Sequence, residues 1–347
     1  MVRVENISKD LGEFFLKDVS IDIGDGEYLM ILGPTGASKT ILLETIAGIY
    51  PPDKGKVYLN NRDVTSLPPR KRNIGMVYQD YMLFPHLNVA KNIRYGLRSR
   101  KHDKKEVAAK VDKLANLLGV SHLLHRYPGT LSGVEQQRIA IARALIMEPE
   151  VLLLDEPLSA LDTETRTKLR EELRRIHSLT CTTMIHVTHS FDEAFLLGNR
   201  IAIMHQGEVV QVGEPDEVFW KPNCKFVAEF LGVCNVFRGD SVIDNGVAYV
   251  NVDGVKVASA TNREGQIYAS IRPEDIIVSL DSVKSSARNS FRGRIRDISD
   301  IGMIVRIHVD AGMPFVAAVT RRSSMDMGLK EGMEVFLTFK ATDVHVF

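Results

Sequence analysis

One segment of the chain has the residue types and the spacing that bind phosphate groups. It follows the short apolar run Tyr28–Leu32 and precedes residues 40–49, which are apolar on one side. In such a strand–turn–helix context, consecutive backbone N–H groups bind phosphate and the helix N-terminus contributes its dipole. Ser38 stands where the strict pattern has its last glycine, so we expect weaker phosphate binding rather than its loss. The predicted phosphate-binding residues are Gly33, Pro34, Thr35, Gly36, Ala37, Ser38, Lys39 and Thr40.

Two carboxylates, Asp155 and Glu156, end a second apolar run that starts at Val151. Such a run is typical of a buried parallel strand, and acids at its carboxyl end suit metal-dependent phosphate chemistry. We expect Thr40 and Asp155 to bind Mg²⁺, and Lys39 to reach the β- and γ-phosphates. Glu156 is the predicted general base that orients the attacking water. The alternative, a helix N-cap pair, is disfavoured because the preceding strand is so apolar.

The elements that position these residues can be read from periodicity. The first two thirds of the chain alternate strand-like runs with helical patterns, which predicts an α/β domain with a mainly parallel sheet. Residues 104–118 carry apolar side chains at helical spacing, and Gly119 follows as the expected C′ residue. Residues 201–204 and 209–212 predict two strands around the turn Gln206–Gly207.

Near Cys234 the pattern changes to short alternating strands. The turn signals between them are Asp244-Asn245-Gly246, Asp253-Gly254 and Asp310-Ala311-Gly312. Asn-Gly and Asp-Gly supply the positive φ angles that tight hairpins need. The C-terminal third therefore predicts a small β-barrel, with the two domains spanning residues 1–232 and 233–347.

Composition narrows the functional classes. Lys and Arg number 44 and Asp and Glu number 44, which argues against bulk nucleic-acid binding. Three scattered cysteines favour a reduced compartment over a disulfide framework. No stretch approaches the roughly 20 apolar residues of a membrane span, so we expect membrane association through a partner. In the basic run 98–105 we favour a solvated helix start over contact with an anionic membrane.

Three segments in a fixed order resemble the ATPase subunit of an ATP-binding-cassette (ABC) transporter. They are Leu131-Ser132-Gly133-Val134-Glu135-Gln136-Gln137-Arg138, Leu154-Asp155-Glu156-Pro157 and Ser159-Ala160-Leu161-Asp162. The resemblance implies that two subunits sandwich two ATP molecules. Ser132 and Gly133 of one subunit would contact the γ-phosphate held by the other, and Asp162 would help set that interface. The family usually has glycine in place of Val134, so we hypothesise that valine crowds the composite site and slows hydrolysis.

The same resemblance assigns further residues. Gln79 matches the glutamine loop, which touches Mg²⁺ and water and faces the membrane partner, and His189 matches the switch histidine, which contacts the γ-phosphate. His186 is expected in the core instead. The residue aligned with the adenine-stacking position is Leu11, and for Phe14 and Phe15 nearby we favour core packing over stacking.

The C-terminal third resembles regulatory domains of importer ATPases through Ile271-Arg272-Pro273-Glu274-Asp275. Three further segments, within 286–289, 320–323 and 340–342, are similar to molybdate/tungstate-binding (Mop-like) domains. A tetrahedral dianion needs a few positive charges and several surrounding donors. The predicted donors are the charges of Arg288 and Lys340, the hydroxyls of Ser286, Thr320 and Ser323, and the backbone N–H of Ala341. Such sites usually form between two copies of the domain, and Arg321 and Arg322 are expected to be surface charges.

Together these resemblances predict an α/β P-loop ABC ATPase domain with a helical subdomain, followed by a small all-β (OB-like) barrel regulatory domain. They imply an ATP- and Mg²⁺-dependent homodimer on the cytoplasmic face of the membrane. Two permease subunits and an extracytoplasmic oxyanion-binding protein would complete a molybdate/tungstate importer, which the cytoplasmic oxyanion would inhibit. Two alternatives stay open: an ATPase for import of sulfate, sugar or polyamine, and a degenerate, non-hydrolysing oxyanion-responsive regulator.

Overall fold

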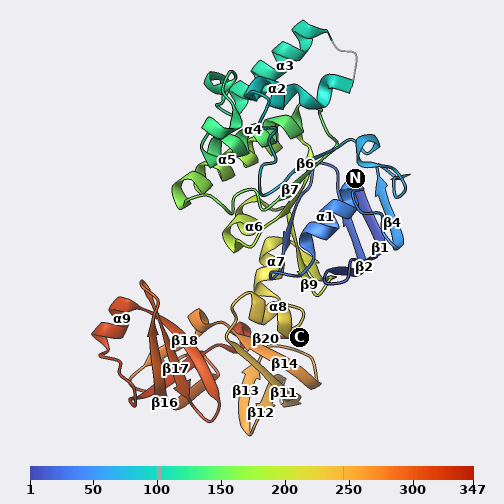
Figure 1. The fold of residues 1–347 in the computed structure, drawn as a ribbon. Coiled ribbons are helices and arrows are strands. Elements are labelled where there is room, and N and C mark those ends of the chain that lie inside the picture. The colour runs from blue at the N-terminus through green and yellow to red at the C-terminus, as the bar shows by residue number, and fades with distance from the viewer. Residues whose placement is uncertain (100–102, 245) are drawn as a thin grey trace. The chain divides into compact units, whose positions relative to one another are not determined.

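The computed structural model describes all residues of the chain except 100–102 and 245 (Figure 1). The chain divides into two compact units, Met1–Val218 and Phe219–Phe347. The division lies upstream of the boundary predicted at 232/233, because helix α8 (Lys225–Phe230) contacts strand β11 (Asn235–Asp244) of the second unit. Within the described residues, no helix combines the length and the apolar character needed to cross a membrane.

A six-stranded sheet, in the order β10-β9-β3-β8-β7-β6, forms the centre of the first unit. The five strands from β9 to β6 are parallel, and β10 pairs antiparallel with β9. Every residue of β3, β7 and β8 is buried, which fits the continuous apolar sequence of β3 and of β7 before Asp155. The strands are β3 (Tyr28–Leu32), β6 (Ile74–Val77), β7 (Val151–Asp155), β8 (Thr183–Val187), β9 (Arg200–His205) and β10 (Glu208–Gly213).

A second, antiparallel sheet has the order β2-β1-β4-β5. It shares one hydrophobic core with the central sheet and helix α1, so this sheet fixes the position of α1. Its strands are β1 (Val2–Asp10), β2 (Phe15–Ile23), β4 (Lys54–Leu59) and β5 (Arg62–Asp63).

The helices of the first unit follow the predicted pattern. Helices α2, α3 and α4 pack together as the expected helical subdomain (Figure 1). Helix α3 ends before Gly119, whose φ of 67° suits a C′ glycine. Of the basic run 98–105, Lys104 and Lys105 at the helix start are solvent-exposed, as expected, whereas residues 100–102 lie outside the described residues. The helices are α1 (Lys39–Ala47), α2 (Val89–Ile93), α3 (Lys104–Leu117), α4 (Gly133–Leu145), α5 (Thr163–Thr180), α6 (Phe191–Leu197) and α7 (Pro215–Trp220).

The second unit is all-β apart from short helices, as predicted. Two five-stranded sheets, β13-β12-β11-β14-β20 and β15-β19-β16-β17-β18, share one hydrophobic core. The turns at Asp253-Gly254 and Asp310-Ala311-Gly312 connect antiparallel partners, whereas Asn245 of the third predicted turn lies outside the described residues. The remaining elements are β12 (Val247–Val252), β13 (Val255–Ser259), β14 (Gly265–Ile271), β15 (Ile277–Ser279), β16 (Asn289–Asp300), β17 (Ile304–Asp310), β18 (Pro314–Thr320), α9 (Arg321–Asp326), β19 (Glu334–Phe339) and β20 (His345–Val346).

The turn between β3 and α1 depends on backbone conformations that side chains restrict. A Cβ atom at Gly33 would lie 2.3 Å from the carbonyl oxygen of Met204, and Gly36 has a φ of 83°. Ser38 is also left-handed, with φ 66° and ψ 26°, and its side chain makes no capping hydrogen bond to α1. The strict pattern has glycine at this position because glycine adopts the left-handed conformation without strain. Ser38 adopts the same conformation at an energetic cost.

Replacing Ser38 with glycine should stabilise the first unit by about 1 kcal/mol, the cost of a left-handed L-residue. Urea unfolding of Ser38→Gly, followed through the transition of the first unit, measures this gain. Ser38→Ala is the matched control, because alanine keeps the left-handed cost without the hydroxyl. Equal stability of Ser38→Gly and Ser38→Ala would refute the conformational explanation.

Candidate functional site

Lys39 is the first residue of α1, and its side chain folds back over the predicted phosphate-binding turn. Its Nζ donates hydrogen bonds to the carbonyl oxygens of Gly33 at 2.8 Å and Pro34 at 2.9 Å. Burial lowers the pKa of Lys39, and the nearby carboxylates of Glu156 and Asp155 partly oppose that shift. The turn thus holds a buried ammonium group beside the N-terminus of α1, an arrangement that fits the phosphates of a nucleotide.

Thr40 and Asp155 meet across the carboxyl edge of the sheet. The Thr40 hydroxyl donates to both carboxylate oxygens of Asp155, at 3.1 and 3.0 Å. Burial raises the pKa of Asp155, although the hydrogen bond from Thr40 opposes the shift. A hydroxyl and a carboxylate are both oxygen ligands of the kind Mg²⁺ prefers. The two predicted metal ligands therefore lie side by side.

Glu156 and His189 form the next pair along this edge. Their side chains are in contact, with Oε1 of Glu156 2.5 Å from Nε2 of His189. The backbone N–H of Glu156 donates to the carbonyl oxygen of Val187, so the residue after β7 is attached to the end of β8. Glu156 is left-handed, with a φ of 46°. The structure brings the predicted base and the predicted switch histidine together.

Gln79 follows β6 by two residues and is exposed. Because β6 pairs in parallel with β7, Gln79 lies at the same sheet edge as Asp155. The next residues have an unusual conformation: Tyr81 and Met82 are both left-handed, and Arg143 of α4 donates to both of their carbonyl oxygens. Arg143 has no local sequence signal that would predict this role, because its partners lie about sixty residues earlier.

The predicted signature segment forms the exposed start of α4. Ser132 is the N-cap residue, and the Glu135 carboxylate accepts hydrogen bonds from its backbone N–H and its hydroxyl, at 2.7 and 2.9 Å. A Cβ atom at Gly133 would lie 3.1 Å from the Tyr81 hydroxyl. Val134 is the second helical residue and is partly exposed. One chain holds only half of the expected composite site, so the roles in trans stay predictions.

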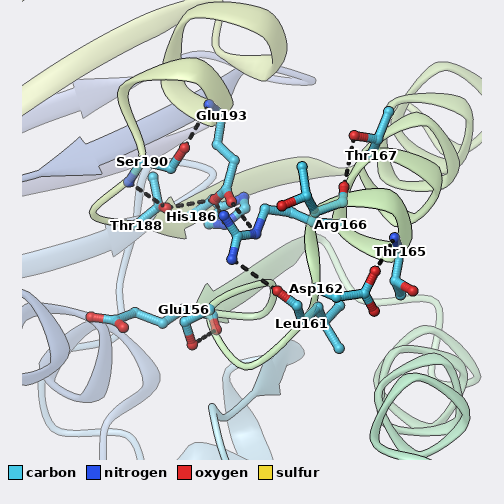
Figure 2. A network of polar contacts seen from close by, with 12 residues as sticks. Glu156, Leu161, Asp162, Thr165, Arg166, Thr167, His186, Thr188, Ser190 and Glu193 are labelled. Carbon is cyan, nitrogen blue, oxygen red and sulfur yellow. Dashed lines mark hydrogen bonds and ion pairs between the residues drawn. The ribbon is translucent and has the colours of Figure 1, made fainter. Parts of the chain in front are cut away.

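Asp162 has a local structural function. It is the N-cap of α5, and its Oδ1 accepts a hydrogen bond of 3.1 Å from the backbone N–H of Thr165 (Figure 2). Hydrogen bonds of this kind lower the pKa of its carboxyl group. Its expected contribution to a dimer interface stays a prediction.

His186 is a core residue, as predicted. Its side chain is fully buried, and Nδ1 lies 3.0 Å from the Tyr28 hydroxyl. Burial lowers the pKa of His186 to about 3, so the ring is neutral at physiological pH. His189, three residues later, is therefore the histidine available at the sheet edge.

The prediction that Phe14 and Phe15 pack in the core is wrong. Their exposed fractions are 41% and 40%, similar to the 39% of Leu11. In β2 the buried face begins with Leu16, so the alternation of the strand turns Phe15 outward. All three side chains are accessible, and which of them contacts adenine stays an open prediction.

The predicted oxyanion donors fall into two groups. The first group lies at the start of β16, where Asn289 pairs with Phe339. The donors that directly precede Asn289 or follow Phe339 are therefore neighbours: Ser286, Arg288, Lys340 and Ala341. The group is exposed at Ser286, Arg288 and Lys340. This end carries the positive charges of the predicted site.

Thr320 and Ser323 belong to the other end of β16. Thr320 pairs with Ile304 of β17. The next residue of β17, Val305, pairs with Asp300 at the end of β16. The hydroxyls of Thr320 and Ser323 are 2.8 Å apart. At roughly 3.3 Å per residue, an extended β16 separates the two groups by about 35 Å. A single chain therefore does not gather all six predicted donors, and the expectation of a site between two copies is compatible with this separation.

Arg321 and Arg322 are surface charges, as expected. Arg321 contacts Asp300 and Arg322 contacts Asp326, and both arginine side chains are more than half exposed. Such exposed ion pairs contribute little to stability.

Comparisons with known proteins agree with this geometry. The family described as ABC transporter matches residues 16–159, and the family described as TOBE domain matches residues 285–346. These matches confirm the predicted fold class, an ABC ATPase domain followed by a small all-β domain.

Named relatives match over almost the whole chain. The molybdate/tungstate import ATP-binding protein of Pyrococcus horikoshii is 47% identical over 348 residues, which cover 100% of both chains. The sulfate/thiosulfate import ATP-binding protein of Vibrio cholerae is 38% identical and covers 97% of this chain and 91% of that protein.

A solved structure extends the likeness to three dimensions. A dimeric ATP-binding cassette in a post-hydrolysis state, bound to ADP and Pi, is 30% identical with a TM-score of 0.56. The match covers 62% of this chain and 99% of that one. Because it is 47% identical to a named relative over the full length of both chains, this chain belongs to the import ATP-binding proteins of ABC transporters, which hydrolyse ATP.

Proposed function

We propose that this protein is the ATP-hydrolysing subunit of a molybdate or tungstate importer, and that its second unit senses the oxyanion. The full-length similarity to a molybdate/tungstate import ATP-binding protein supports the transported solute. The observation that carries the sensing is the division of six anion-binding donors into a cationic group and a hydroxyl group within one domain. In this proposal the protein is a homodimer on the cytoplasmic face of the membrane, bound to two permease subunits that receive oxyanion from an extracytoplasmic binding protein.

The catalytic roles follow from the contacts at the sheet edge. Lys39 binds the phosphates within the turn, Thr40 and Asp155 with the nearby Gln79 hold Mg²⁺, and Ser132 and Gly133 reach the γ-phosphate from the partner subunit. When bound, the ion supplies positive charge against the negative charge that develops on the phosphates. Glu156 accepts a proton from the attacking water, and His189 orients that carboxylate and the γ-phosphate.

A second copy of the chain completes the oxyanion site. Each group of donors is bordered by an exposed apolar side chain. Ile277 lies near Lys340, because it pairs with Thr338 of β19. Met303 lies near Thr320, because its carbonyl oxygen accepts a hydrogen bond from the backbone N–H of Arg321. In a two-fold dimer the cationic group of one copy faces the hydroxyl group of the other, and the apolar borders supply the contact area. Two equivalent sites result.

Oxyanion bound between the two copies inhibits transport. The ligand stabilises the arrangement in which the two C-terminal units are joined across these sites, and in that arrangement the ATPase units are held apart. Inhibition then requires the oxyanion to bind this arrangement more tightly than the one that hydrolyses ATP. An importer for another solute remains the rival function, and absence of molybdate and tungstate binding favours it.

Glycine in place of Val134 should accelerate ATP hydrolysis. Val134 is the second residue of α4. Removing its branched side chain opens space beside Ser132 for the partner's γ-phosphate. Steady-state ATPase rates of Val134→Gly and wild type in the permease complex measure the effect, expected at about threefold or more, or roughly 0.7 kcal/mol. Val134→Ala should lie between the two, and a rate for Val134→Gly at or below wild type refutes the hypothesis.

Loss of one donor from either group should weaken oxyanion binding by the full-length protein. Charge-assisted hydrogen bonds contribute about 1.5–3 kcal/mol, so Arg288→Ala should weaken molybdate or tungstate binding by about tenfold or more in calorimetric titration. Thr320→Val should weaken it as well. Arg322→Ala is the control, since Arg322 is 92% exposed and contacts Asp326 one helical turn away.

Mixing the two defective proteins tests whether the site is shared between copies. In a mixed dimer of Arg288→Ala and Thr320→Val, one site carries both defects and the other carries none. Half of the dimers are mixed in an equal mixture, so about a quarter of the wild-type sites should return. No recovery in the mixture, with normal dimerisation, rules out the shared site.

A further inference from the structure

A buried carboxylate that the catalytic roles do not use lies behind His189. Glu193 of α6 is 3% exposed, and its Oε2 accepts a hydrogen bond of 2.5 Å from the Thr188 hydroxyl. Thr188 directly precedes His189, and the same hydroxyl accepts from the backbone N–H of Ser190 at 3.1 Å. Glu193 therefore restrains the backbone on both sides of His189 through one side chain (Figure 2).

The second carboxylate oxygen of Glu193 faces Arg166 of α5. Arg166 Nε lies 4.0 Å from Oε1 of Glu193, while its Nη2 donates to the carbonyl oxygen of Leu161 at 2.9 Å (Figure 2). Leu161 belongs to the segment 159–162, which precedes α5 and follows Glu156. The guanidinium group of Arg166 thus connects this segment with Glu193.

Two buried nitrogens around Glu193 have no hydrogen-bond partner among the described residues: Arg166 Nε and His186 Nε2. They lie 4.0 and 3.9 Å from opposite oxygens of the carboxylate, just beyond hydrogen-bond distance. Burial raises the pKa of Glu193, and the hydrogen bond from Thr188 and the positive charges of Arg166 and Arg170 oppose that shift.

A buried charge with such partners is unfavourable unless all its contacts are made. The contacts of Glu193 come from two elements: Thr188 and His186 belong to the end of β8, and Arg166 belongs to α5. Packing alone could fill this volume with an apolar side chain. A carboxylate that accepts a hydrogen bond from Thr188 and faces the guanidinium group of Arg166 fixes the relative position of β8 and α5 more strictly than apolar packing does.

We propose that Glu193 and Arg166 are positioning residues for ATP hydrolysis, which keep His189 and the segment 159–162 in register with each other. Neither residue contacts the phosphate-binding turn, so their effect falls on the hydrolytic step and leaves nucleotide binding unchanged. The inference rests on the catalytic role proposed for His189, because the restraint on Thr188 matters only if His189 must be placed accurately.

The test compares Glu193→Gln with wild type in the full-length protein bound to its permease. Gln keeps the size and can still accept from Thr188, but it lacks the charge that faces Arg166 and His186. We expect kcat to fall by about 10- to 100-fold, as misplacement of a reacting group does, with KM for Mg²⁺-ATP within about twofold of wild type. The rate is expressed per nucleotide site, counted by ADP bound at saturation, so that a smaller folded fraction is not mistaken for a slower step.

Three further variants make the outcome decisive. Glu164→Gln, the same substitution at an exposed ion pair with Lys168 on α5, should leave kcat unchanged. Combining Arg166→Gln with Glu193→Gln should cost no more than the worse single variant, because both remove one link. His189→Ala should remove hydrolysis; if it does not, the proposed catalytic role itself fails. If His189→Ala is inactive while Glu193→Gln keeps its kcat per site, or if the two losses multiply, the positioning role is overturned.

Discussion

The contact between the Thr40 hydroxyl and the Asp155 carboxylate is the constraint on which the rest of the structure depends. Thr40 is the second residue of α1, the helix after β3, and Asp155 ends β7, with β8 lying between these strands in the sheet. Their side chains can meet only if the turn 33–38 folds back over the carboxyl edge of the sheet. The left-handed conformations in that turn, including the one at Ser38, are the cost of this arrangement.

The same edge concentrates groups that burial destabilises. Burial lowers the pKa of Lys39 and raises that of Asp155, so each group depends on the other for its charge. The buried strands β3, β7 and β8 compensate for these groups, because they leave no position exposed and most of their side chains are apolar. The polar groups of the site thus lie at the carboxyl end of strands that pack in the core. Glu193, near His189, is a further buried acidic group, and it is held by the Thr188 hydroxyl.

Much of this organisation could be predicted from the sequence. Continuous apolar runs located β3 and β7, and the acids after β7 located the site, because parallel strands end at one edge. Gly119 marked the end of α3, and Asp253-Gly254 marked a hairpin. These features depend on local backbone chemistry, which neighbouring residues reveal.

Other features could not be predicted, because they depend on residues far apart in the sequence or on which face of a strand is buried. Glu193 looks like an ordinary helical residue, since Thr188 and Arg166 approach it only after β8 and α5 are packed. Core packing is the prediction for Phe15, but the alternation of β2 places Leu16 inward and Phe15 outward. The separation of Arg288 from Thr320 follows from the length of β16, which pattern reading did not fix.

The most direct test of the account concerns metal binding at the Thr40–Asp155 contact. Mn²⁺ can replace Mg²⁺, and electron paramagnetic resonance then measures metal bound together with ATP in a Glu156→Gln background that prevents hydrolysis. We expect Asp155→Asn to lower Mn²⁺ affinity by about tenfold or more, while metal-free ATP binding is unchanged. Equal Mn²⁺ affinity with and without Asp155→Asn would show that this edge of the sheet does not hold the metal and ATP together.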